Sequence, residues 1–89
     1  MSSRKSKAWF QLYIKLKDRS FMAKYYVNKR AQVNGDHEVH KLGCSYMPSE
    51  ENRKYLGEFS SCRPAVAEAK KEYRQVNGCY YCSRECHTS

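Results

Sequence analysis

Three cysteines and one histidine lie within the last 11 residues of this 89-residue chain: Cys79, Cys82, Cys86 and His87. Cysteine thiolates and histidine nitrogens are typical zinc ligands. Two cysteines can instead form a disulfide, and Cys-x2-Cys spacings also occur in redox and haem-attachment motifs. The tail therefore has three candidate chemistries: a metal site, a disulfide clasp, or a redox or haem motif.

A second group of candidate ligands lies well before the tail, at His37, His40 and Cys44. Two separated ligand pairs are typical of a structural zinc site, because one tetrahedral ion ties two distant segments together. His37 and His40 are three residues apart on a predicted strand, so they point to opposite faces. His40 and Cys44 flank a predicted turn. We predict a Zn(II) site formed by His40, Cys44, Cys79 and Cys82, with Cys86, His87 and Cys62 as alternate ligands.

The elements that must hold these ligands are marked by turn and capping residues. Residues 24–33 are rich in β-formers, Asn34-Gly35 favours a type I′ turn, and residues 37–42 form the return strand. Residues 45–57 are a polar connection. A helix then begins near Ser60 or Ser61 and ends at Asn77-Gly78. The predicted fold class is α+β: a small metal-stapled domain with a β-hairpin, one helix and a C-terminal cysteine turn.

The segments "VHKLGCSYM", "LGEFSSCRPAVAEAKK" and "NGCYYC" also resemble a known family. They are similar to the Ada-type zinc-binding domain of bacterial DNA alkylation-repair proteins, and more so to small His/Cys modules appended to some bacterial nucleases. The resemblance covers residues 37–82 and implies the same four ligands and a bacterial origin. In the repair domain all four ligands are cysteine and one accepts a methyl group. Position 40 is histidine here, so the resemblance implies a fold and a metal rather than that activity.

Charge divides the chain unevenly. Residues 1–30 hold nine basic residues and one acidic residue, whereas residues 31–89 are balanced at eight of each. We predict a basic N-terminal arm over residues 1–21 and a zinc-binding domain over residues 22–89. Clustered basic side chains hold phosphates by releasing counterions, although such an arm is also often a solvated terminus. The candidate nucleic-acid-binding residues are Arg4, Lys5, Lys7, Lys15, Lys17, Lys29 and Arg30.

Length and composition restrict the class of protein further. A chain of 89 residues makes one domain with a marginal core, which a structural zinc ion can stabilise by roughly 10–16 kcal/mol. The sequence has no run of about 18 apolar residues and no signal-peptide pattern, so we expect a cytoplasmic protein that spans no membrane. The sequence shows no catalytic arrangement, so we predict no enzyme, and it identifies no small-molecule substrate. We expect a monomer or a weak dimer.

The predicted function is a structural zinc-binding module that mediates interaction with a partner, either a protein or nucleic acid. One alternative is a thiol-based repair or redox protein with a reactive cysteine among Cys44, Cys62 and Cys79. Another is a disulfide-stapled domain of an exported protein. Separately, Cys86 could pair with Cys62 instead of binding metal. If Cys62 has no such role, we expect it to be a small buried residue on the apolar stripe of the predicted helix. We expect His37 to be a surface residue of its strand. Four tyrosines could either pack in the core or stack on the bases of a nucleic acid, and we favour the core: Tyr25, Tyr26, Tyr80 and Tyr81.

Overall fold

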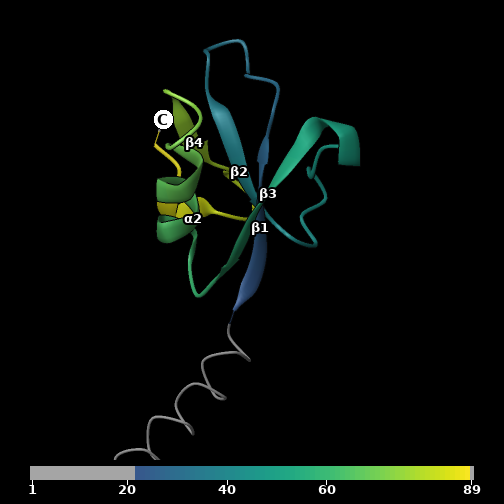
Figure 1. Ribbon diagram of the computed structural model, residues 1–89, viewed down its shortest axis with the longest axis vertical. Helices are drawn as coiled ribbons and strands as arrows, with labels where there is room; N and C mark the ends of the chain where they lie inside the picture. Colours follow the sequence, from purple (N-terminus) through teal and green to yellow (C-terminus); the bar gives the residue numbers. More distant parts are fainter. Residues whose placement is uncertain (1–21, 89) are drawn as a thin grey trace, which may run out of the picture.

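The computed structural model describes residues 22–88, in which a four-stranded sheet carries one helix (Figure 1). The strand order is β3-β1-β2-β4; β1 pairs antiparallel with β2 and β3, whereas β4 runs parallel to β2. The α+β class predicted from the sequence is confirmed. The helix and strands are β1 (Ala23–Asn28), β2 (His37–Lys41), β3 (Arg53–Phe59), α2 (Cys62–Ala69) and β4 (Val76–Gly78), and the two 3-10 turns are η1 (Glu50–Asn52) and η2 (Arg84–Cys86).

The predicted hairpin is present, but its turn is longer than predicted. β1 ends at Asn28, and residues 29–36 connect it to β2. Gly35 has φ 95°, but no non-glycine residue between 22 and 88 has a positive φ, so Asn34-Gly35 is not a type I′ turn. The Asn34 side chain instead accepts a hydrogen bond from the Asp36 N–H. Gln75 also donates to the Asn34 carbonyl, so a distant segment shapes the turn.

Two further strands replace segments that we predicted as connection and helix. Residues 53–59 form β3, which pairs with β1, although we assigned residues 45–57 to a polar connection. The helix ends at Ala69 rather than near Gly78, and Val76–Gly78 forms β4. The open edge of β2 explains this change, because the His37 N–H donates to the Gln75 carbonyl and backbone donors must be satisfied.

The core lies between α2 and one face of the sheet. Alternation along β1 buries Tyr25 and Val27 on the side of the helix, together with Val39 of β2. From α2, Ala65 and Ala69 complete the cluster. The first helical residue, Cys62, is joined to Cys86 of η2 by a disulfide. These buried side chains are few and mostly small, and a core of this size usually needs a cross-link for stability.

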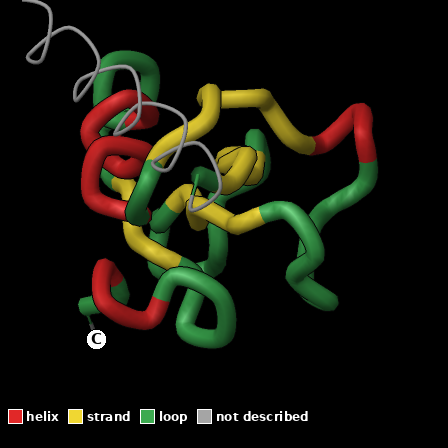
Figure 2. Tube along the Cα trace, turned by 90° about the horizontal axis from the view of Figure 1, so that it is seen from below, coloured by secondary structure: helices red, strands yellow, loops and turns green. Residues whose placement is uncertain are grey.

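The C-terminal segment packs beside the helix that covers the core. Figure 2 shows the tube from below, with the C-terminal loop and η2 beside the helix. Of the four tyrosines that we assigned to the core, only Tyr25 is buried; Tyr80 and Tyr81 are exposed, and that part of the prediction is wrong.

In the described part of the chain no helix has the length and apolar character to cross a membrane. The predicted arm over residues 1–21 lies outside the described residues.

Candidate metal centre

Four side chains meet where β2 and β4 end: His40, Cys44, Cys79 and Cys82. Each offers one ligand atom, and all four atoms lie within 4.8 Å of one another. The Sγ atoms of Cys44 and Cys79 are 3.9 Å apart, and Cys82 Sγ is 3.8 Å from His40 Nδ1. His40 and Cys79 are buried, whereas Cys44 and Cys82 are half-buried. This cluster could hold a metal ion.

The parallel pairing of β2 and β4 brings the two ligand pairs together. Parallel strands end at the same edge of a sheet, so residues that follow β4 lie beside the end of β2. The Cys79 N–H donates to the Val39 carbonyl at 2.9 Å, which places Cys79 next to His40. The Ser83 N–H donates to the Cys79 carbonyl and closes the turn that returns Cys82 to the cluster.

Two glycines make these turns sterically possible. Gly43, with φ 96°, reverses the chain after β2 so that Cys44 faces His40, and the Cys44 N–H donates to the Lys41 carbonyl at 3.0 Å. Gly78 is required for close approach: a Cβ there would lie 2.6 Å from the Ser83 carbonyl oxygen and 2.7 Å from the Cys86 Cβ. Both glycines therefore position ligands.

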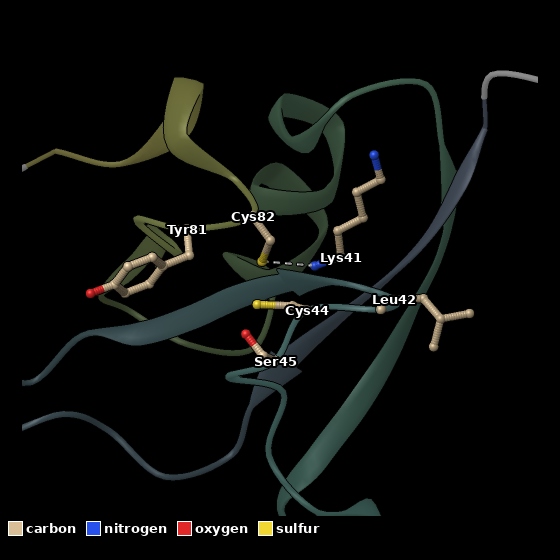
Figure 3. Close-up of a pocket in the computed structure, with 7 residues that line it drawn as sticks. Lys41, Leu42, Cys44, Ser45, Tyr81 and Cys82 are labelled. Atoms are coloured by element: carbon tan, nitrogen blue, oxygen red, sulfur yellow. Dashed lines mark hydrogen bonds between the residues drawn. The ribbon is translucent and has the colours of Figure 1, made fainter.

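Burial favours the neutral form of two of the four groups, the Cys82 thiol and the His40 imidazole. Burial, and then the contact with Cys44, raises the pKa of the Cys82 thiol to about 12. The Lys41 backbone N–H, 3.3 Å from Cys82 Sγ, opposes this rise because it stabilises the thiolate (Figure 3). Burial lowers the pKa of His40, so its imidazole stays neutral at pH 7. A bound cation would therefore take the place of the Cys82 thiol proton.

The two nitrogens of His40 have different neighbours. Nδ1 faces Cys82, whereas Nε2 lies 3.7 Å from Glu38 Oε1. Within residues 22–88, Nε2 is a buried side-chain nitrogen without a hydrogen-bond partner. Nδ1 would therefore be the ligand atom for a bound ion, and Glu38 is the carboxylate nearest to Nε2. Metal-binding histidines usually donate their second N–H to such a group.

The donor set and its spacing fit zinc. A tetrahedral ion with Zn–S bonds near 2.3 Å places sulfur atoms about 3.8 Å apart, close to the separation of Cys44 and Cys79. Three thiolates and one imidazole are a common structural zinc set. Zinc would be held by His40 Nδ1 and the three Sγ atoms. An iron–sulfur cluster usually takes four thiolates, whereas this cluster offers three.

The alternate ligands lie outside the cluster. Cys62 and Cys86 are bonded to each other, so a disulfide and the candidate metal cluster, which we treated as competing chemistries, are present together. His87 Nδ1 is 2.9 Å from the Gly78 carbonyl oxygen. His37 stacks on Tyr73 with ring centroids 3.9 Å apart and is half-buried. The sequence offered the Cys62–Cys86 pairing only as one alternative, because no spacing rule links cysteines of separate elements.

The candidate nucleic-acid-binding residues are only partly described. Lys29 and Arg30 are exposed in the loop between β1 and β2, outside the metal cluster. The other members lie outside the described residues: Arg4, Lys5, Lys7, Lys15 and Lys17. Lys41 and Tyr81 line a shallow pocket of about 450 Å³ beside Cys44 and Cys82 (Figure 3). The sequence prediction missed Lys41, and it named Tyr81 but favoured a place in the core. Their positions between or next to predicted ligands were the available signal.

Fold and site together define a small α+β domain with a Cys3His cluster that closes its C-terminal turn onto the sheet. Comparisons with protein-family models, curated proteins and solved structures find no match for this chain. The likeness to Ada-type domains therefore stays a prediction. The function must be inferred from the chemistry of the site.

Proposed function

We propose that this chain is a structural zinc-binding module. Zn(II), bound by His40, Cys44, Cys79 and Cys82, ties the end of β2 to the turn after β4. The observation that supports this most strongly is the convergence of four ligand atoms within 4.8 Å from segments 35 residues apart. Three thiols and a neutral imidazole around one point are the donors that zinc prefers.

The energetic need for such an ion follows from the small core. Six residues make up the buried cluster, and two of them are alanines. A structural zinc ion contributes roughly 10–16 kcal/mol of apparent folding free energy at neutral pH, which is comparable to the whole stability of a small domain. The module would therefore fold when zinc binds.

The biological role that we propose for the module is to bind a partner. Exposed tyrosines on both ligand-bearing segments support this role, because clustered exposed aromatic side chains mark interaction sites. The many basic residues of segment 4–30 would add long-range attraction to a polyanion. Zinc would then be structural, and it would fix the surface that the partner meets.

Native mass spectrometry of the reduced, freshly purified chain tests the metal. We expect one zinc ion per chain, lost after chelation together with the folded state. Co(II) substitution should give the visible absorption of a tetrahedral thiolate site. His40→Gln should lose the ion, whereas the matched control His87→Gln should keep it, because His87 lies outside the cluster. Metal-free wild-type protein, or equal loss in both variants, would overturn the proposal.

A further inference from the structure

Three exposed tyrosines gather on the segments that carry the metal ligands. Tyr46, Tyr80 and Tyr81 are 57%, 45% and 65% exposed, respectively. The rings of Tyr46 and Tyr81 stack with centroids 4.2 Å apart, and Tyr80 meets Tyr81 edge-on at 5.2 Å. We refer to these three residues as the tyrosine platform. Soluble proteins seldom leave contiguous aromatic area exposed unless it binds something.

The metal ligands and the platform alternate along the chain. Tyr46 comes two residues after Cys44, and Tyr80 and Tyr81 lie between Cys79 and Cys82. The stack of Tyr46 on Tyr81 therefore joins the same two segments that a bound ion would join. An ion in the cluster would hold the platform in a fixed shape, which lowers the entropy lost when a ligand binds.

Cationic and hydroxyl groups border the platform. Two adjoining shallow pockets share Lys41, Tyr81 and Cys82, so they form one open groove past the cluster. Figure 3 shows the Lys41 and Tyr81 side chains on either side of Cys82. Arg84 also lines the groove and lies over the Tyr80 ring at 4.9 Å. Serine hydroxyls add hydrogen-bonding groups, and the residues that line the two pockets include a single carboxylate, Glu85.

We propose that this surface binds single-stranded nucleic acid. Bases stack on the tyrosine platform, and Lys41 and Arg84 contact the phosphates. Aromatic rings beside a cationic groove are the combination that binds unpaired strands, because every base presents a π-face and every linkage a negative charge. A duplex hides its base faces within its own stack, so it offers the platform much less. This inference rests on the proposed function, since the zinc ion would fix the platform.

The test measures fluorescence anisotropy of labelled 12-mer oligodeoxythymidine and oligouridine with the zinc-loaded full chain. We expect Tyr81→Ala and Tyr46→Ala each to weaken binding about tenfold or more, which is the usual effect of removing an aromatic side chain that stacks on a base. Lys41→Gln and Arg84→Gln should weaken binding and flatten its salt dependence, because each removes a phosphate contact. A duplex of the same length should bind less tightly than the single strand.

Matched controls separate the platform from general basic attraction. Tyr55→Ala removes a 49% exposed tyrosine of β3, on the far edge of the sheet from β4, and should leave affinity unchanged. Lys71→Gln removes an exposed lysine paired with Glu68, and it should lower oligonucleotide affinity less than Lys41→Gln does. Native mass spectrometry of each variant checks that zinc is retained.

The outcomes distinguish the two proposals. A chain that binds zinc but neither oligonucleotide would overturn the nucleic-acid inference and leave the zinc module intact. Equal affinity of Tyr81→Ala, Tyr46→Ala and wild type would also overturn it. So would displacement of the oligonucleotide by a polyglutamate peptide that carries the same charge. That last result would indicate an acidic protein partner. A wild-type chain without zinc would overturn the proposed function itself.

Discussion

At the scale of single residues, the orientation of His40 is the feature from which most of the site chemistry follows. Its Nδ1 faces Cys82, and its buried Nε2 faces the Glu38 carboxylate. The sequence predicted His40 over His37 because strand residues three apart point to opposite faces. The contribution of Glu38 could not be predicted, since i, i+2 spacing on a strand only places both side chains on one face. The distance between them depends on rotamers set by packing.

Removing the charge of Glu38 should weaken zinc binding without removing a ligand. In Glu38→Gln we expect zinc affinity to fall about 10- to 100-fold, because a carboxylate that accepts from Nε2–H orients the ring and raises its basicity. Competition with a zinc chelator measures the change. Glu58→Gln, at an exposed position on β3, is the control and should bind zinc like wild type. Equal affinity of the two variants would show that Nε2–H does not need Glu38.

Zinc binding should release protons and weaken in acid. The pKa of Cys82 is raised to about 12, chiefly by burial, so its thiol is protonated at pH 7.5 and must lose that proton to the solvent. The pKa of His40 is lowered, so the imidazole releases none. We expect at least one proton per zinc ion, measured by calorimetry in two buffers of different ionisation enthalpy. Affinity that stays constant from pH 8 to pH 6 would contradict this picture.

At the scale of elements, local sequence did not predict β4, and it offered the Cys62–Cys86 disulfide only as one alternative. Asn77-Gly78 has the composition of a helix stop, and nothing nearby marks the earlier end at Ala69. β4 forms because β2 has an open edge, which is a property of the whole sheet. The Cys-x2-Cys pair was predictable because its geometry lies within one turn. The Cys62–Cys86 bond joins two elements, and only their packing brings the thiols together.

Removal of the disulfide should cost stability while zinc binding is retained. In the double variant Cys62→Ala, Cys86→Ala we expect unfolding by urea to become easier by about 2–4 kcal/mol, since the bond closes a loop of 24 residues. Zinc stoichiometry should remain one, because neither cysteine belongs to the cluster. Loss of zinc in this variant would instead return Cys62 or Cys86 to the ligand set.

At the scale of the whole molecule, a disulfide and the proposed zinc site need different redox conditions. One disulfide requires an oxidised pair, whereas three cysteines must stay reduced to hold zinc. Disulfides persist in oxidising compartments and are rare in the cytosol. Counting the thiols of protein from its own cells therefore also tests the cytoplasmic location that we expect from the sequence.

Chelation should unfold the chain and expose its thiols. With zinc bound, we expect alkylation of Cys44, Cys79 and Cys82 to be slow, and after chelation we expect all three to react quickly. Cys62 and Cys86 should react only after reduction. Mass spectrometry of the labelled peptides identifies each site, and circular dichroism follows the loss of the sheet. Full helical and sheet signal after chelation would show that the ion is not structural.

The parallel pairing of β2 with β4 also constrains the order in which the chain folds. The β1–β2 hairpin pairs residues close in sequence, such as Val27 with Val39, so it can form early. β4 pairs with residues about 40 positions earlier. Closing that loop lowers the chain entropy before any favourable contact has formed. An ion already held by Cys79 and Cys82 could capture the edge of a preformed hairpin. Zinc would then speed folding as well as stabilise its product.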